Sequence, residues 1–368
     1  MSKETTPDDG SGSDSDDSGS NLNSDGWEPH TLAVDTGGGR LDETEPSREQ
    51  PLVTVVVTTY DRFEEATRAI ESVLKQSYEP IEFLVVEDGT ESGIQQWLGE
   101  KGYDSVRYVR HATNQGLSGG RNTAIALASG EYIAFLDDDD SWKPHRIERQ
   151  IELIRSLSEP ERERLGVVYC AVEAREKGRI ASIILPENSG NLRESIMRDG
   201  PSTLQSSCLF SKQVLVDVGG YDESLLSSVD HDIWLSLAVH EYDAAAVAEP
   251  LVISYDTFAD SMMTNTDNRI KGVSQFVEKW RPTYIDWFGP REGDRRLQRY
   301  FARVIGRLAA TKLVCGCFIE AKRATTALFD QSDQIGYNIA VLTVLTAEAA
   351  IKRFVPAPVV RRLSALQN

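Results

Sequence analysis

Four consecutive aspartates, residues 137–140, are the part of this chain that points most directly to chemistry. They follow the short apolar run 131–136, which is typical of a buried strand, and Trp142 and Pro144 come soon after them. Adjacent carboxylates repel one another, so they are tolerated where solvent or a hard cation lies among them. The pattern therefore predicts a metal site at the end of a strand.

Two other interpretations of these aspartates remain open from the residues alone. An acidic run is often a solvated loop that binds nothing. A calcium loop is the second, because four oxygen-bearing residues have its ligand spacing: Asp137, Asp139, Ser141 and Glu148. Trp142 stands where that loop needs a glycine, Pro144 interrupts it, and a strand rather than a helix precedes it, so calcium is disfavoured.

Two earlier segments end in polar residues in the same way. Residues 52–59 and 81–86 are apolar and rich in β-branched side chains, which is typical of strands covered on both faces. Between them, residues 63–74 have apolar side chains at helical spacing, with Asp61 as a candidate N-cap, so the order predicts a βαβ unit. Ligands of open α/β sheets bind beyond the carboxyl ends of the strands, and we expect three polar clusters to meet there. These clusters are Thr59, Tyr60 and Asp61; Glu87, Asp88 and Gly89; and residues 137–140.

A glycine-rich stretch, residues 114–122, follows a short third strand at 106–109 and leads into a helix of small residues at 123–129. We interpret the stretch as a turn in which small residues allow close approach of a ligand or tight packing of the helix on the sheet. Arg121 would place a cation near a bound phosphate.

Four motifs, in this order and at this spacing, resemble the amino half of family 2 glycosyltransferases of the GT-A fold. They are Val-Val-Thr-Thr-Tyr-Asp-Arg ending at residue 62, Val-Val-Glu-Asp-Gly ending at 89, Asn-Gln-Gly-Leu-Ser-Gly-Gly-Arg-Asn ending at 122, and Gly-Glu-Tyr-Ile-Ala-Phe-Leu-Asp-Asp-Asp-Asp-Ser-Trp ending at 142. The resemblance covers about residues 51–255. It implies an α/β, Rossmann-like mixed sheet flanked by helices, a nucleoside diphosphate-sugar donor, and a divalent metal bound by an Asp-x-Asp motif.

The resemblance also implies roles for individual residues. The donor-binding residues would be Thr59 and Tyr60 beside the base, Asp88 accepting a hydrogen bond from a base imide, Asp137 or Asp138 reaching the ribose, and Asp61 and Arg121 in the same site. Asp139 would ligate Mg²⁺ or Mn²⁺ bridging the diphosphate. Thr58 and Asp61 stand where the family commonly has Pro and Asn, and Glu87 stands where it has Asp, which leaves the preferred base open.

Asp230 is the candidate catalytic base. From the residues alone it could equally be the N-cap of a helix, with Asp232 in the first turn. The resemblance aligns Asp230 with the carboxylate that removes the proton of the acceptor hydroxyl in an inverting transfer. His231 has no second His or Cys at ligand spacing, so we interpret it as a pocket or surface residue, and Asp222 as a residue that shapes a turn.

The two ends of the chain differ in charge. Residues 1–50 carry 13 acidic and 3 basic residues and almost no apolar ones, and we expect a disordered acidic tail without the features of a signal peptide. Residues 291–368 carry 13 basic and 6 acidic residues in an amphipathic helical pattern, which is compatible with peripheral contact with an anionic membrane or with a helical cap on the catalytic domain. The overall charge of −19 argues against nucleic acid as a ligand.

These observations predict three parts: a tail at 1–50, a GT-A catalytic domain at 51–260 and a C-terminal helical extension at 261–368. The predicted function is a metal-dependent inverting glycosyltransferase that passes a sugar to a saccharide or lipid-linked (polyprenyl or dolichyl phosphate) acceptor, in the cytoplasm or at the inner face of the cell membrane. A dinucleotide-dependent oxidoreductase is disfavoured because Thr59, Tyr60 and Asp61 stand where its Gly-x-Gly-x-x-Gly would be, and no P-loop is present. A non-catalytic nucleotide-sugar or glycan-binding module remains an alternative.

Overall fold

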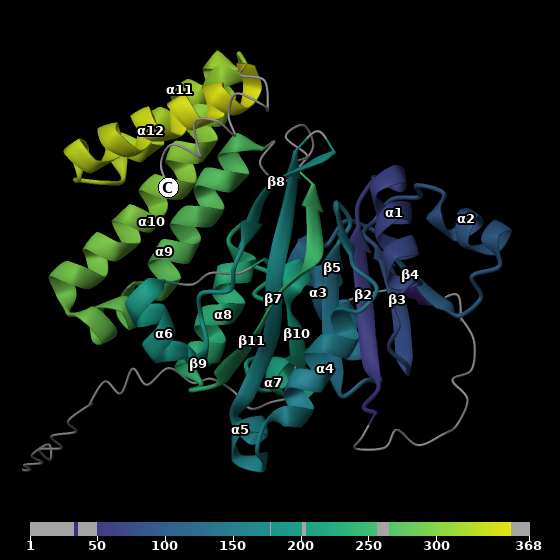
Figure 1. The fold of residues 1–368 in the computed structure, drawn as a ribbon. Coiled ribbons are helices and arrows are strands. Elements are labelled where there is room, and N and C mark those ends of the chain that lie inside the picture. The colour runs from purple at the N-terminus through teal and green to yellow at the C-terminus, as the bar shows by residue number, and fades with distance from the viewer. Residues whose placement is uncertain (1–32, 36–49, 177, 201–203, 256–264, 355–368) are drawn as a thin grey trace, which may run out of the picture.

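The computed structural model describes residues 33–35, 50–176, 178–200, 204–255 and 265–354. Its centre is one mixed sheet of 11 strands with the order β1-β4-β3-β2-β5-β10-β7-β11-β6, in which β8 pairs with β7 and β9 pairs with β11 (Figure 1). The strands are β1 (Ala33–Asp35), β2 (Val53–Thr59), β3 (Ile81–Glu87), β4 (Val106–His111), β5 (Tyr132–Asp137), β6 (Asp140–Trp142), β7 (Leu165–Glu176), β8 (Arg179–Ile184), β9 (Gly190–Asn191), β10 (Leu209–Ser211) and β11 (Asp243–Tyr255).

The amino half of the sheet is parallel, as the continuous apolar runs predicted. β2 lies between β3 and β5 and pairs with both in parallel, and β3 pairs in parallel with β4. The register sets Thr59 opposite Glu87 and Thr58 opposite Asp137. The carboxyl ends of β2, β3 and β5 therefore lie at the same level of the sheet, which brings their polar clusters together.

Helices cover both faces of this sheet. They are α1 (Phe63–Val73), α2 (Ile94–Lys101), α3 (Gly116–Leu127), α4 (Arg146–Ser156), α5 (Glu159–Arg164), α6 (Leu192–Asp199), α7 (Lys212–Asp217) and α8 (Val229–Val239). Side chains of β2 alternate between two cores, because successive residues of a strand point to opposite faces. Val55 packs with α1, α2 and α4, whereas Val56 packs with α3, α7 and α8. Each face of the strand is thus buried.

The glycine-rich stretch is mostly helical, which corrects the predicted turn. α3 begins at Gly116, seven residues before the predicted start, so Arg121 lies inside the helix. The reason is the carboxylate of Asp88, which accepts hydrogen bonds from the backbone N–H groups of Gln115 and Gly116 at the start of α3. Gly89 is required beside it, because a Cβ there would lie 2.2 Å from the backbone nitrogen of Asn114.

The carboxy-terminal helices are α9 (Thr266–Phe288), α10 (Pro290–Val314), α11 (Phe318–Asp330) and α12 (Ile335–Phe354). They lie together on the α8 side of the sheet (Figure 1). Phe276 of α9 and Phe301 of α10 belong to the same buried cluster as Val56 of the sheet, so the predicted helical extension packs as a cap on the catalytic core. Within the described residues, no helix is both long and apolar enough to span a membrane.

Part of the predicted tail is ordered. Residues 33–35 form β1, which pairs antiparallel with β4 at the edge of the sheet, with Ala33 opposite His111. Val34 and its neighbours are the one short apolar run of the tail, which is enough to add an edge strand. The remainder of the predicted tail, residues 1–32 and 36–49, lies outside the described residues.

Candidate functional site

A cleft of about 820 Å³ opens at the carboxyl ends of β2, β3 and β5. It is strongly acidic. Its lining includes all but one of the residues to which the sequence analysis gave a role in chemistry: Thr59, Tyr60, Asp61, Asp88, Asp137, Asp138, Asp139 and Asp230. The exception is Arg121, whose side chain is fully buried beneath the cleft. The separate strand ends and the α8 aspartate do converge on one cavity.

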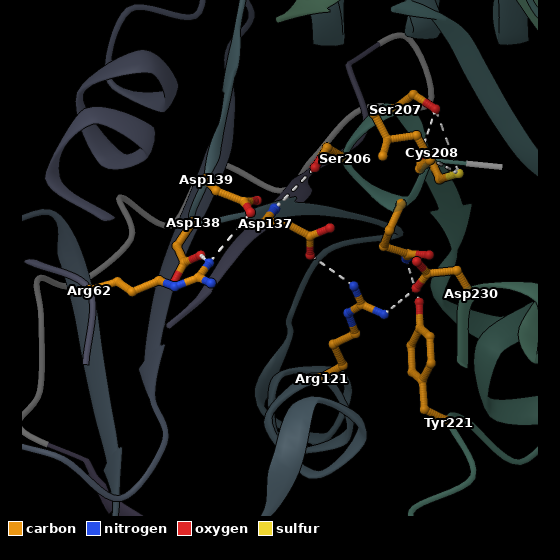
Figure 2. A network of polar contacts seen from close by, with 12 residues as sticks. Arg62, Arg121, Asp137, Asp138, Asp139, Ser206, Ser207, Cys208, Tyr221 and Asp230 are labelled. Carbon is orange, nitrogen blue, oxygen red and sulfur yellow. Dashed lines mark hydrogen bonds and ion pairs between the residues drawn. The ribbon is translucent and has the colours of Figure 1, made fainter. Parts of the chain in front are cut away.

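One end of the cleft is formed by Asp138 and Asp139. Thr59 Oγ1 donates to Asp138 Oδ2 at 2.8 Å, and Arg62 Nη1 lies 2.9 Å from Asp138 Oδ1 and 3.4 Å from Asp139 Oδ2 (Figure 2). Burial raises the pKa of the Asp138 carboxyl, although Arg62 and Thr59 oppose the rise. The sequence analysis gave no role to Arg62, and its place directly after the Thr-Thr-Tyr-Asp motif was the available signal.

The other end of the cleft is held by Arg121. Its Nη2 lies 2.8 Å from Asp137 Oδ1 and its Nη1 lies 2.6 Å from Asp230 Oδ1, so one guanidinium joins β5 to α8 (Figure 2). Burial disfavours the charged guanidinium, but the charges of Asp230 and Asp137 outweigh it and raise the pKa of Arg121. Arg121 therefore lies inside α3 rather than in the predicted turn, and its guanidinium is a buried link between β5 and α8.

The pKa of the Asp137 carboxyl is raised by burial and by neighbouring negative charges. Burial raises the pKa of its carboxyl to about 6; Arg121 opposes this, and the neighbouring charges of Asp230 and Asp139 add to it. Asp140, the last of the four aspartates, is the first residue of β6, is buried and does not line the cleft. Burial, together with the charges of Asp139 and Asp137, raises its pKa well above the usual range.

The carboxylate of Asp88 makes three contacts with other protein groups, which the sequence did not indicate. Its Oδ1 accepts from the backbone N–H of Gln115 at 2.7 Å and lies 2.8 Å from His111 Nδ1, and its Oδ2 accepts from the N–H of Gly116 at 2.8 Å. The His111 ring in turn contacts Thr123 Oγ1 at 2.9 Å. Asp88 thus joins the end of β3 to β4 and α3 while still lining the cleft.

The turn before α1 also differs from expectation. Asp61 is not the N-cap of α1: that position is taken by Arg62, whose side chain makes no cap hydrogen bond. Asp61 instead has a left-handed backbone with φ of 55°, and its N–H donates to Thr90 Oγ1 at 3.3 Å. Tyr60 is 53% exposed at the mouth of the cleft. Tyr60, Asp61 and Arg62 of this turn therefore line the cleft.

Asp230 lies in the first turn of α8, but the N-cap is Ser228, with φ of 66°. The C-terminal helices hold this turn, which sequence reasoning did not anticipate because the contacts are far apart along the chain. Tyr300 of α10 donates to Ser228 Oγ at 2.8 Å, and Arg269 of α9 donates to Ser227 Oγ. The base candidate is therefore positioned by α9 and α10 as well as by Arg121.

The residues around Asp230 have structural partners. His231, which the sequence suggested as a pocket or surface residue, is half-buried and packs edge-on against Phe276 of α9 and Tyr300 of α10. Burial lowers its pKa to about 4, against the opposing charge of Asp230. Asp232 lies 2.8 Å from Lys279 Nζ and accepts from Trp280 Nε1 at 2.8 Å, which ties α8 to α9. Asp222 accepts from the Ser224 backbone N–H at 2.9 Å, so it does shape its turn.

The carboxylate oxygens that line the cleft are suitable ligands for a divalent cation. Among the described residues, no group of three or more Asp, Glu, His or Cys side chains is arranged so that it could hold a metal ion by itself. Mg²⁺ and Mn²⁺ need less than that, because one or two carboxylates hold them in sites completed by substrate phosphates and water. Asp137, Asp138, Asp139 and Asp230 form ion pairs with two arginines, Arg62 and Arg121, so the carboxylates outnumber these cations at the place where a divalent ion would bind.

Comparison with known proteins gives consistent results. Residues 54–177 match the family described as glycosyl transferase family 2. A protein named as a colanic acid biosynthesis glycosyl transferase, WcaA of Escherichia coli K12, is 27% identical over 248 residues, which span 64% of this chain and 84% of WcaA. One named as a teichuronic acid biosynthesis glycosyltransferase, TuaG of Bacillus subtilis, is 35% identical over 113 residues, which span 30% of this chain and 44% of TuaG.

Two solved structures share the fold. Residues 1–349 of S. aureus TarS, in complex with UDP-GlcNAc, superpose with a TM-score of 0.54 at 16% identity, covering 83% of this chain and 93% of that one. The mannosyltransferase PcManGT of Pyrobaculum calidifontis, in complex with GDP-Man and Mn²⁺, gives 0.51 at 16% identity, covering 88% and 90%. At these identities the likeness concerns the arrangement of helices and strands.

Proposed function

The chain carries a glycosyl transferase family 2 domain on a GT-A fold, and from that premise we propose that it is a metal-dependent, inverting glycosyltransferase. The donor would be a nucleoside diphosphate-sugar and the acceptor a hydroxyl. The observation that carries the proposal is the arrangement of the cleft, in which Asp230 of α8 lies in the same cavity as Asp138 and Asp139 at the strand ends.

Asp230 is the proposed base. A single-displacement transfer needs a carboxylate that removes the proton of the acceptor hydroxyl as its oxygen attacks the anomeric carbon. Arg121 contacts Oδ1 of Asp230, and a carboxylate has a second oxygen, so this contact orients the group without using all of its capacity to accept a proton. The fixed guanidinium keeps the carboxylate at one place in the cleft.

The cation is required by the charge of the cleft. Its lining carries eight carboxylates and one arginine side chain: Asp61, Glu64, Glu65, Asp88, Asp137, Asp138, Asp139 and Asp230, with Arg62. A diphosphate is itself an anion and would be repelled from this surface. We propose that Asp139, with Asp137 or Asp138 beside it, holds Mg²⁺ or Mn²⁺, which would neutralise the diphosphate as it leaves.

The nucleotide would lie between the β2 and β3 ends. Tyr60 is exposed and available to stack on a base, with Thr59 beside it. Asp88 accepts three protein donors, and because a carboxylate offers about four acceptor sites, it retains one for a base imide. The titles of the two structural relatives name UDP-GlcNAc and GDP-Man as bound donors, which supports a nucleotide-sugar and leaves both bases open.

The acceptor is proposed from the relatives and from the C-terminal helices. WcaA and TuaG are named for the assembly of surface polysaccharides, which favours a saccharide or lipid-linked acceptor at the cytoplasmic face of the membrane. Phe318 and Ile319 at the start of α11 are 68% and 71% exposed, and Lys322 follows on the same helix. Such a surface suits peripheral contact with an anionic bilayer. Sedimentation with anionic vesicles, compared with Phe318→Ser, tests this contact.

The base assignment is tested by Asp230→Asn. The variant keeps the size and a hydrogen-bond acceptor for Arg121 but cannot take a proton. We expect donor affinity within about twofold of wild type and a transfer rate lower by 10²-fold or more, which is the range for a general base. Calorimetry with a set of nucleotide-sugars and an assay of sugar transfer give the two quantities. Transfer at the wild-type rate would refute the base.

The metal assignment is tested by Asp139→Ala. We expect loss of Mn²⁺-stimulated binding of the nucleotide-sugar, measured as the Mn²⁺-dependent rise in melting temperature, since a ligand of the folded state stabilises it. Equal affinity with and without Mn²⁺ in wild type would remove the metal from the proposal. Donor binding by wild type without any turnover would instead identify a non-catalytic nucleotide-sugar-binding module.

A further inference from the structure

Arg62 occupies the carboxylates to which the proposed function assigns the cation. Its Nη1 lies 2.9 Å from Asp138 Oδ1 and 3.4 Å from Asp139 Oδ2, so a single nitrogen bridges the two side chains. In Figure 2 the guanidinium reaches these aspartates from the opposite side to Arg121. A divalent cation bound at this place would bridge the same two carboxylates, so the Arg62 nitrogen stands where such a cation would bind.

The contact between Arg62 and the two aspartates is electrostatic. Burial disfavours the charged form of Arg62, but the carboxylates of Asp138 and Asp139, with Glu65 nearby, outweigh it and raise the pKa of the guanidinium. Arg62 is therefore a cation at any working pH. It supplies the charge compensation without which two adjacent aspartates in a cleft would repel each other.

The contact is also one that the fold can release. The Arg62 side chain is 19% exposed and faces the cleft, in contrast to Arg121, which is fully buried. Arg62 is the N-cap of α1 but its side chain makes no cap hydrogen bond, so the helix does not depend on where the guanidinium lies. Its long aliphatic stem allows the head group to move by rotation about side-chain bonds alone.

A neighbouring arginine shows the difference between a fixed and a releasable cation. Arg68, on α1, donates from Nη2 to the backbone oxygen of Asp139 at 3.2 Å and stacks on the ring of Tyr255. It adds positive charge close to the same aspartates without pairing with their carboxylates. Arg68 therefore contributes to the general field of the site, whereas Arg62 occupies the ligand atoms.

We propose that Arg62 is an exchangeable counterion: it pairs with Asp138 and Asp139, would compete with a divalent cation for these two carboxylates, and would contact the diphosphate of the donor once the cation holds them. This inference rests on the proposed function for the identity of the cation and the donor. It adds that one arginine affects the two ligands in opposite directions, weakening the binding of the free metal and strengthening the binding of the diphosphate.

The test measures binding and needs no turnover. Mn²⁺ binding is followed by the electron paramagnetic resonance signal of free Mn²⁺, and UDP and GDP binding at saturating Mn²⁺ by calorimetry, for wild type, Arg62→Gln and the matched control Arg68→Gln. For Arg62→Gln we expect Mn²⁺ affinity to rise about tenfold and nucleoside diphosphate affinity to fall about tenfold, because a charge-assisted contact to phosphate is lost. For Arg68→Gln we expect a change of Mn²⁺ affinity below about threefold.

Each outcome separates the inference from the function on which it rests. Unchanged Mn²⁺ affinity in Arg62→Gln, or equal gains in both variants, would overturn the competition, and so would an absence of Mn²⁺ binding in wild type and Arg62→Gln alike. If Arg62→Gln binds UDP and GDP as tightly as wild type does, the proposed contact between the Arg62 guanidinium and the diphosphate would be overturned. Asp139→Ala is included as the reference: if it binds Mn²⁺ as wild type does, the proposed metal site fails regardless of Arg62.

Discussion

The two ends of the cleft use an arginine between carboxylates in opposite ways. Arg121 is fully buried, comes from the interior of α3 and joins Asp137 on β5 to Asp230 on α8. Arg62 is partly exposed, comes from the β2–α1 turn and pairs with two adjacent aspartates of one segment. The first links three elements and belongs to the fold; the second links neighbouring side chains at the mouth of a cavity and belongs to the ligand site.

The difference teaches how a chain can keep an acidic cleft stable before any ligand binds. A buried ion pair contributes little net stability, but loss of one partner is costly because it leaves a charge without compensation. Loss of one partner from an ion pair near the surface costs much less, so such a partner can be exchanged for another cation. We therefore expect Arg121 to stay in place at the end of the cleft that holds Asp230, the base end. At the other end, the metal end with Asp138 and Asp139, Arg62 can be exchanged for a metal ion.

The largest expected effect comes from Arg121→Met. This change leaves Asp137 and Asp230 facing each other without their shared cation, so we expect a loss of about 3 to 5 kcal/mol in the free energy of unfolding. Urea unfolding measures it. Arg62→Gln should lose clearly less stability in the same experiment, because Arg62 and Asp139 are partly exposed to solvent. Equal losses in the two variants would show that the two ends of the cleft are not different in kind.

A smaller, pH-dependent effect comes from His231, which packs beside the base. Its pKa is lowered to about 4 in the folded protein, compared with about 6.5 for an unfolded chain. The unfolded state therefore takes up the proton first, and wild-type stability contains a contribution that is present above pH 6.5 and is lost as the pH falls toward 4.

Replacement of the ring tests this contribution. His231→Phe keeps an aromatic side chain against Phe276 and Tyr300 but does not titrate. Between pH 7 and pH 5 we expect wild type to lose about 1 to 2 kcal/mol more stability than the variant, measured by urea unfolding at each pH. Parallel pH profiles of the two proteins would contradict the burial of a neutral imidazole.

The smallest expected effect comes from Tyr300→Phe. The change removes one hydrogen bond, from the Tyr300 hydroxyl to Ser228 Oγ at the start of α8. We expect a loss of about 0.5 to 1.5 kcal/mol in the free energy of unfolding. If α10 positions Asp230, the transfer rate should fall while donor affinity is unchanged. A variant with normal kcat would show that the hydrogen bond between Tyr300 and Ser228 does not position Asp230 for catalysis.

Many residues of the cleft could be predicted from the sequence because they directly follow apolar runs that are typical of strands. The apolar runs at 52–59, 81–86 and 131–136 indicate parallel strands, and the polar residues that follow each run must then meet at one edge of the sheet. The start of α3 was predicted wrongly because its first turn is stabilised by Asp88, 27 and 28 residues earlier, and not by a neighbour in the sequence.

The chain alone therefore determined that the carboxylates at the ends of β2, β3 and β5 gather in the cleft, since strand register depends on hydrophobic patterning that can be read locally. Only the tertiary structure decided which cation faces which carboxylate. Arg121 and Asp230 are 109 residues apart and Arg62 and Asp138 are 76 apart, and no periodicity in the sequence relates such pairs. The same holds for the contact between Tyr300 and Ser228, which exists because α10 packs across the start of α8.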